Sequence, residues 1–183
     1  MAGIDERLIQ MRVGGLVVDP NTKSPIVVLR GVDDDRLYLP IYVGGSEASA
    51  IAAALSDVEL PRPMTHDLVS NILGLVGIGL QKVTIIDLVD GTFYAELNLS
   101  DDQGHQWHLD SRPSDAIALA LRAGAEVFVA QKVVEEAGGI AEEEDDEGLE
   151  EGAEPETSGA PIIVAADVDL EDLDPDDFGG YEM

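Results

Sequence analysis

Composition and charge set the first limits on this chain of 183 residues, 45% of them hydrophobic, which is enough to bury a core in one domain. The sequence has no cysteine, and this excludes disulfide bonds, thiolate metal sites and a cysteine nucleophile. It shows no signal peptide and no apolar run of membrane-spanning length, so we expect a cytoplasmic protein with no membrane partner.

The formal net charge of −28 is concentrated at the C-terminal end. From Glu142 onward there are 18 acidic residues and no basic one, which leaves 20 acidic and 10 basic residues before that point. Acidic blocks mixed with Gly, Pro and Thr gather too little apolar surface to offset their ordering entropy. We therefore predict a domain over residues 1–138 and an acidic, disordered tail over residues 139–183. An apolar island at 161–166 is typical of segments that dock on a protein partner; a solvated tail without a partner is the alternative.

Three strands are predicted in the first part of the chain. Residues 11–18 and 26–30 flank a cluster of turn residues, so we expect a hairpin, and the pair Gly14-Gly15 indicates a bulge or a close backbone approach. Residues 36–43 form the third strand, in which Pro40 indicates an edge or a second bulge.

Two helices follow. Ser46 is a suitable N-cap for a helix over residues 47–55, whose small residues favour close packing. Thr65 is a suitable N-cap for a second helix that ends at Gly74. His66-Asp67 falls in the first turn of this second helix.

A tight hairpin is the next prediction, because strands over residues 82–89 and 92–99 flank Asp90-Gly91, the pair expected in a type I′ turn.

The segment over residues 105–110 alternates as a strand does. Trp107 and Leu109 share one face, which we expect to lie against the core. His108 and Asp110 share the other face and should be accessible.

The segment from Asp110 to Arg122 changes from charged to apolar within a few residues, as a helix entering a core does. Pro113 is favourable in the first turn, Ser111 or Ser114 can act as the cap, and Asp115 complements the helix dipole. Residues 116–121 are all apolar, which predicts burial on most sides of the helix.

The last predicted elements are a short strand over residues 126–130 and a short helix over residues 131–137. Taken together, the elements predict an α+β fold, with a mixed, mostly antiparallel sheet that contains hairpins and packs against two or three helices.

Four of these segments together resemble the bifunctional nuclease (BFN) domain family over roughly residues 8 to 138. The resemblance implies a compact α+β domain that cleaves both DNA and RNA. The residues that carry it are Pro40-Ile41-Tyr42-Val43 with Glu47-Ala48 and Ala50-Ile51, Arg62-Pro63-Met64-Thr65-His66-Asp67-Leu68, Asp90-Gly91-Thr92-Phe93-Tyr94-Ala95, and Asp110-Ser111-Arg112-Pro113-Ser114-Asp115-Ala116-Ile117-Ala118-Leu119-Ala120.

Phosphodiester hydrolysis needs an activated water and neutralisation of the charge that develops on phosphorus, commonly by divalent cations. We expect Asp67, Asp110 and Asp115 to be catalytic carboxylates and ligands of Mg or Mn. We expect His66 or His108 to act as the base and Arg112 as a phosphate clamp. Asp110, Arg112 and Asp115 should line one depression together with His66 or Asp67 from the other capped helix. Further candidates in or beside the motifs are Asp87, Asp90, Glu96 and His108.

Each carboxylate also has a simpler interpretation as a cap, a turn residue or a solvated charge, with Asp115 capping its helix and Arg112 pairing with Asp110. The excess of acidic residues predicts weak binding of nucleic acid. The alternative function is therefore a non-catalytic, oligomeric regulatory or protein-interaction module. We expect a homo-oligomer, with Pro40 or the apolar residues 73–80 at the contact.

Overall fold

The computed structural model describes residues 7–56 and 60–141, and within these ranges the chain forms one eight-stranded sheet and four helices. The strands lie in the order β6-β5-β4-β7-β1-β2-β3-β8, and all neighbours are antiparallel except β4 and β7. This confirms the predicted α+β class with a mostly antiparallel sheet. The element bounds are β1 Leu8–Val18, β2 Pro25–Gly31, β3 Leu37–Tyr42, α1 Gly45–Leu55, α2 Thr65–Leu75, β4 Ile78–Val89, β5 Thr92–Asp101, β6 Gln106–Ser111, α3 Pro113–Ala123, β7 Glu126–Ala130, α4 Gln131–Ala137 and β8 Gly139–Ile140.

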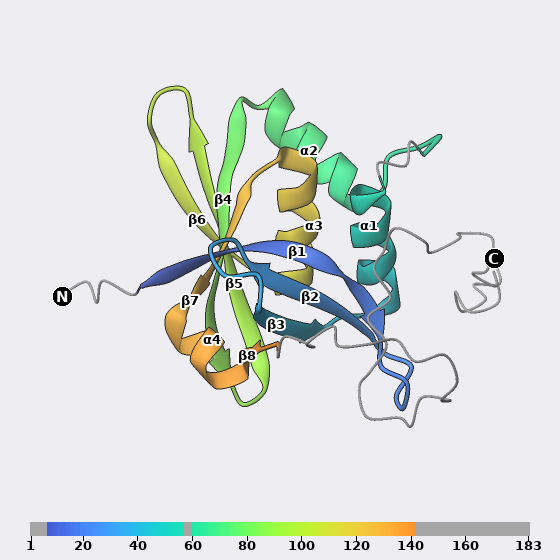
Figure 1. Ribbon diagram of the computed structural model, residues 1–183. Coiled ribbons are helices and arrows are strands. Elements are labelled where there is room, and N and C mark those ends of the chain that lie inside the picture. The colour runs from blue at the N-terminus through green and yellow to red at the C-terminus, as the bar shows by residue number, and fades with distance from the viewer. Residues whose placement is uncertain (1–6, 57–59, 142–183) are drawn as a thin grey trace, which may run out of the picture.

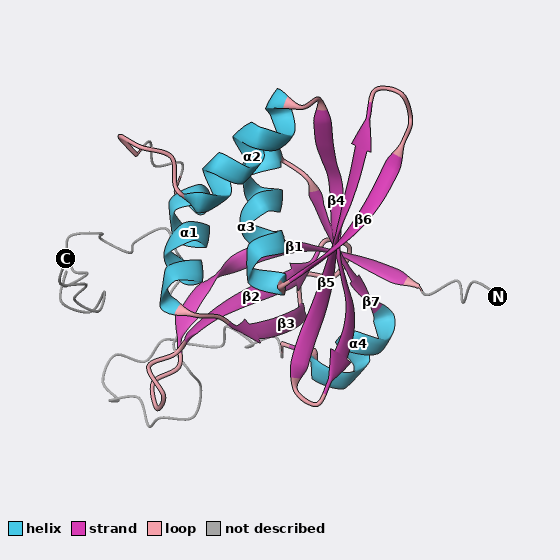
Figure 2. Ribbon diagram, turned by 180° about the vertical axis from the view of Figure 1, so that it is seen from behind, coloured by secondary structure: helices cyan, strands magenta, loops and turns pink. Residues whose placement is uncertain are grey.

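The helices divide between two ends of the molecule. Helices α1, α2 and α3 pack together in the order α1-α3-α2, whereas α4 lies at the far end, against β3, β4 and β7 (Figures 1 and 2). The sheet curls, so that the end of β3 and the beginning of β5 line the same cavity. No helix in the described part of the chain is long and apolar enough to cross a membrane.

Both predicted hairpins are present. Strands β1 and β2 pair antiparallel, and the register shifts between Val13 and Gly15, which confirms the predicted bulge. Strands β4 and β5 are joined by Asp90 and Gly91, whose φ angles of 50° and 76° are both positive. A type I′ turn requires that geometry at its two central positions, so this prediction is confirmed.

Helix α3 is the centre of the core. It begins at Pro113, and seven of its residues are buried, including the whole run Ala116–Ala120. It packs on α1, α2, β4 and β5. The helix ends at Gly124, whose φ of 65° is left-handed and therefore favours glycine. The predicted burial on most sides of this helix is confirmed.

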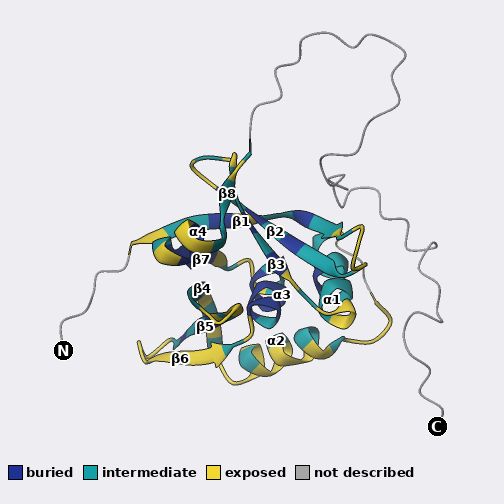
Figure 3. Cartoon of the chain, turned by 90° about the horizontal axis from the view of Figure 1, so that it is seen from below, coloured by how far each residue is buried: buried dark blue, intermediate teal, exposed yellow. Residues whose placement is uncertain are grey.

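The prediction for Trp107 and Leu109 is wrong, because these side chains are 42% and 53% exposed. They do share a face with the buried Leu97 and Leu99 of β5, as the pairing shows. Their strand, however, is the last in the sheet, and no helix covers it among the residues described. Figure 3 shows β6 exposed along its length.

Several predicted boundaries shift by a few residues. Helix α1 has Gly44 at its N-cap instead of Ser46, and α2 has Met64 at its N-cap instead of Thr65. In α3 neither serine caps, because Arg112 holds the N-cap position without a side-chain bond. The sheet also continues past the predicted domain end at Gly138, since β8 pairs with Leu37 and Tyr38 of β3. The rest of the predicted acidic tail, with its apolar island, lies outside the described residues.

Candidate functional site

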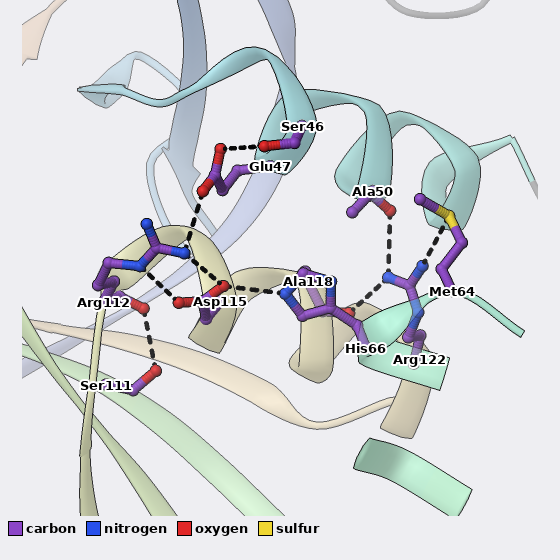
Figure 4. Close-up of polar contacts among 10 residues, drawn as sticks. All are labelled: Ser46, Glu47, Ala50, Met64, His66, Ser111, Arg112, Asp115, Ala118 and Arg122. Atoms are coloured by element: carbon purple, nitrogen blue, oxygen red, sulfur yellow. Dashed lines mark hydrogen bonds and ion pairs between the residues drawn. The ribbon is translucent and has the colours of Figure 1, made fainter. Parts of the chain in front are cut away.

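Three helices begin at one place in the fold. Glu47, His66 and Asp115 stand in the first turns of α1, α2 and α3 respectively, and Arg112 immediately precedes α3. Figure 4 shows that these four side chains form one chain of polar contacts. We call this group the Arg112 network.

Arg112 is the centre of the network. Its Nε donates to Asp115 Oδ2 at 2.7 Å and its Nη2 donates to Asp115 Oδ1 at 3.2 Å. Nη2 also lies 3.0 Å from Glu47 Oε1. On the far side of Asp115, His66 Nε2 is 3.0 Å from Oδ1. Nη1 of Arg112 has no protein partner within the described residues, so this N–H group remains free to donate.

The side chains of the network differ in exposure, and the pKa values of its two carboxylates are lowered. The Arg112 side chain is 66% exposed, whereas those of Glu47 and His66 are only 17% and 13% exposed. Burial acts to raise the pKa of Asp115, but hydrogen bonds from Arg112 and His66 outweigh it and bring the pKa below its usual range. Hydrogen bonds from its own backbone N–H and from Ser46 lower the pKa of Glu47, and the charge of Arg112 adds to this effect.

A cavity of about 380 Å³ lies beside the network, and both Glu47 and Arg112 line it. Two aromatic residues, Tyr42 and Phe93, stand on its wall. Asp115 and His66 are not part of the lining, so they lie behind Arg112 as seen from the cavity. The complete lining is Ile41, Tyr42, Val43, Gly44, Glu47, Gly91, Thr92, Phe93, Arg112, Pro113 and Ser114.

Asp67 belongs to a different cluster. Its carboxylate accepts hydrogen bonds from Arg122 Nε and from the backbone N–H of Met64. Arg122 is 10% exposed and also donates to the carbonyl groups of Ala50 and Ala118. This arginine therefore ties α1, α2 and α3 together, and the hydrogen bond from Arg122 lowers the pKa of Asp67. This pair, in which Arg122 is nearly buried and Asp67 is 34% exposed, has a structural role.

Asp110 is separate from both clusters. It lies on β6 opposite Glu96 of β5, and the neighbouring His108 Nδ1 is 2.6 Å from Glu96 Oε1. No contact joins Asp110 to the Arg112 network in the part of the chain that the structure describes. The predicted pairing of Arg112 with Asp110 is wrong, because Arg112 pairs with Asp115 and Glu47 instead.

Of the five site residues expected from sequence, the structure thus brings together His66, Arg112 and Asp115, and places Asp67 and Asp110 elsewhere. Sequence reasoning missed Glu47 as a site residue. Two features of the sequence could have indicated Glu47. It lies in the first turn of a helix that follows a strand, and it belongs to one of the motifs that resemble the family.

The carboxylates do not fit one metal ion as they are arranged. Asp67, Asp110 and Asp115 do not converge, and the described residues include no group of three His, Asp or Glu side chains that could hold a metal. Glu47 and Asp115 converge on one guanidinium group, which occupies their facing oxygens and offsets one of their two negative charges. As arranged, these residues do not form a metal site.

Comparison with known proteins places this architecture in a family. The family model of the bifunctional nuclease domain matches residues 27–142, which run from within β2 past the end of β8 and include the whole Arg112 network. The chain belongs to this family.

Individual relatives agree with that assignment. An uncharacterized protein of Mycobacterium tuberculosis is 41% identical over 138 residues, which cover 75% of this chain and 81% of that protein. Bifunctional nuclease 2 of Arabidopsis thaliana is 33% identical over 98 residues, or 52% of this chain and 30% of its own length. Bifunctional nuclease 1 of Oryza sativa subsp. indica is 29% identical over 109 residues, or 58% of this chain and 33% of its own length.

Proposed function

We propose that this chain hydrolyses phosphodiester bonds of DNA and RNA in the cavity beside Arg112. One observation carries the proposal: a free guanidinium N–H group and an ionised carboxylate, that of Glu47, belong to residues that line the same cavity. Family membership and the names of the plant relatives support the same reaction class.

Arg112 binds the phosphate in this proposal. Two of its nitrogens are fixed by Asp115, so the planar group is held in one orientation and the remaining Nη1 can donate to a phosphate oxygen. His66 holds the second carboxylate oxygen of that aspartate from behind. Asp115 and His66 are therefore positioning residues, and we do not assign His66 as the base.

Glu47 acts on the attacking water. Its carboxylate accepts a proton as the water oxygen forms a bond to phosphorus, and the bond from phosphorus to the leaving oxygen breaks. Solvent protonates the leaving oxygen. The lowered pKa of Glu47 keeps the carboxylate ionised at neutral pH but makes it a weaker base, so we expect slow turnover.

The walls of the cavity favour a single-stranded substrate. Tyr42 is 61% exposed, and with Phe93 it offers aromatic surface on which an unpaired base can stack. Because the part of the chain before residue 142 has twice as many acidic as basic residues, the electrostatic attraction that duplex binding requires is missing. Binding should therefore be weak, as the sequence predicted.

The test is a cleavage assay of the full-length chain on fluorescent single-stranded and duplex DNA and RNA. Arg112→Gln should lower kcat/KM by about 100-fold, as loss of one charge-stabilising donor does in other enzymes. Arg12→Gln is the matched control, since Arg12 is a half-exposed arginine that pairs with Asp35. Equal activity of wild type and Arg112→Gln would overturn the proposal. Parallel reactions with Mg, Mn or chelator test the metal dependence that the sequence predicted.

The alternative of a non-catalytic module is favoured by the net negative charge and by exposed apolar side chains on α2 and β6. Absence of cleavage on all four substrates, with every metal, would support that alternative.

A further inference from the structure

A second cavity, of about 350 Å³, lies among the three helices that pack together. Its lining comes from α1, α2, α3 and the connection between α1 and α2, and no residue lines both this cavity and the one beside Arg112. Its volume falls within the range of about 300 to 1,000 Å³ that is typical of small-molecule sites. We call it the Arg122 cavity, after the arginine on its wall.

Helix α2 turns a polar face toward the Arg122 cavity. Ser70 and Asn71 come three and four positions after Asp67, so the three residues share one face of the helix, and all of them line the cavity. Leu68 and Ile72 are instead 53% and 50% exposed. Helices usually turn their apolar side toward neighbouring elements, and α2 does the reverse at this cavity. Convergent polar groups of this kind are typical of a site for a small polar molecule.

Arg122 keeps a hydrogen-bond donor available at this cavity. Its side chain is only 10% exposed, and its Nε and Nη1 are bonded to Asp67 and to the carbonyl groups of Ala50 and Ala118. Among the described residues Nη2 has one contact, the Met64 sulfur at 4.0 Å (Figure 4). Met64 lines the cavity as well. A thioether is a weak acceptor and Nη2 carries two N–H groups, so a strong donor remains for a ligand.

Asp67 supplies acceptors beside that donor. Its Oδ1 accepts from Arg122 and its Oδ2 accepts from the backbone N–H of Met64, so each oxygen has a further lone pair to offer. The charges of Asp67 and Arg122 offset each other. A phosphate at this place would meet the carboxylate, and a cation would meet the guanidinium group. The lining therefore fits an uncharged ligand that has an acceptor next to its donors.

We propose that the Arg122 cavity binds a guanine base. Guanine presents the O6 carbonyl, the N1–H group and the 2-amino group in a row along one edge. O6 accepts from Arg122 Nη2, while N1–H and the 2-amino group donate to the two oxygens of Asp67. Ser70 and Asn71, whose side chains make no hydrogen bond within the described residues, remain for the other ring nitrogens. Apolar lining residues such as Ala54 pack against the ring.

The other bases match this row of groups less well. Adenine and cytosine each offer one amino group beside a bare ring nitrogen, and uracil offers one N–H group between two carbonyls. Each of them can form at most two of the three hydrogen bonds, which leaves a polar group of the site without a partner. A site built around three hydrogen bonds rejects such ligands.

A bound base covers part of the inner face of α2, a helix that has no buried residue. Asp67 directly follows His66, so the ligand also holds the turn whose histidine contacts Asp115. The inference does not rest on the proposed nuclease activity, because a guanine base contains no phosphodiester bond and the two cavities share no lining residue.

Isothermal titration calorimetry of the full-length chain with guanosine, inosine and adenosine tests the proposal. Guanosine should bind with one site per chain. Inosine lacks only the 2-amino group, and the loss of one hydrogen bond to a carboxylate should weaken its binding by about tenfold or more. Adenosine should bind more weakly than inosine, because it also presents an amino group where guanosine presents O6.

Two variants test the place of binding. Ala54→Leu fills the cavity and should weaken guanosine binding by at least about 100-fold, because its side chain takes the space of the ligand. Circular dichroism confirms that this variant folds. Asp67→Asn replaces one of the two acceptors by a donor and should remove the preference for guanosine over inosine, even if Ala54→Leu fails to fold. Asp102→Asn, at an exposed position outside the cavity, is the matched control and should bind as the wild type does.

Three results would overturn the proposal. The first is the absence of guanosine binding to the wild type, and the second is equal affinity for guanosine and adenosine. The third is binding that Arg112→Gln abolishes while Ala54→Leu leaves it intact, which would place the nucleoside in the cavity beside Arg112 instead.

Discussion

Helices α2 and α3 both contribute to the Arg112 network, and they are held in opposite ways. Helix α3 has seven buried residues, whereas α2 has none: it packs on the core through partly buried residues such as Leu73, and His66 and Asp67 make polar contacts at its first turn. The site therefore combines α3, which packing holds in place, with the first turn of α2, whose position depends more on a few hydrogen bonds. Local opening at α2 would disconnect His66 while leaving Arg112 and Asp115 in place.

The largest expected effect is the difference in stability between two isoleucine-to-alanine variants, one in α3 and one in α2. Ile117→Ala should lower the free energy of unfolding by about 2–5 kcal/mol, because Ile117 is fully buried in α3. Ile72→Ala should cost under about 0.5 kcal/mol at low protein concentration, because Ile72 is 50% exposed on α2. Urea unfolding measures both, and equal losses would remove the distinction between the helices.

Arg122 links α2 to α1 and α3, so replacing it should have the second largest effect on stability. Arg122→Ala leaves Asp67 and two carbonyl groups without their donor, and we expect a loss of about 1–3 kcal/mol in urea unfolding. The control Arg12→Ala removes an exposed ion pair and should cost under about 1 kcal/mol. If the two variants lose the same stability, α2 is not held through Arg122.

A smaller contrast lies within α3 itself. Ala118→Leu overpacks the helix interface and should cost about 1–3 kcal/mol, whereas Asp115→Asn should cost about 0.3–1 kcal/mol. Comparison of urea midpoints tests the order. The reverse order would show that Asp115 and its contacts to Arg112 and His66 matter more for stability than packing does.

The smallest expected effect is the pH dependence of the contribution that Asp67 makes to the free energy of unfolding. The hydrogen bond from Arg122 lowers the pKa of Asp67, so the folded state favours the ionised carboxylate. This contribution is complete above the unfolded pKa of about 3.9 and is lost as the pH falls through the lower folded value. Asp67→Asn should therefore differ from wild type by under about 1 kcal/mol at pH 6, and the difference should shrink as the pH falls below about 3.9. Asp102→Asn, at an exposed position outside both clusters, is the matched control.

Sequence was sufficient where local chemistry determines structure. Pro113, Asp115 and the apolar run after them placed α3, and Asp90-Gly91 placed the second hairpin. Sequence was insufficient where the burial of a sheet face depends on whether another element covers it. Alternation assigned Trp107 and Leu109 to the correct side of the sheet, but it carries no information on whether a helix reaches that far.

The site could be predicted in part for the same reason. His66, Arg112 and Asp115 were expected together because each stands at the start of a helix or beside one. Glu47 was missed because only the packing of α1 against α3 brings it to Arg112. Asp67 resembled a site residue in sequence, yet its partner Arg122 comes 55 positions later, and no local pattern reveals that pairing.

The position of β7 has a consequence for folding. This strand joins β1 to β4, and its residue Ala130 pairs with Leu8 near the other end of the domain. Before it is in place, the meander β1-β2-β3 and the meander β4-β5-β6 each have an open inner edge, and they are connected through the packing of α1 and α3. The pairing of β7 with β1 closes a loop of more than a hundred residues, which makes nucleation slow. The two half-sheets expose strand edges until that loop closes. A nascent chain therefore cannot complete the sheet until residue 130 has been made, and its inner strand edges stay open until then.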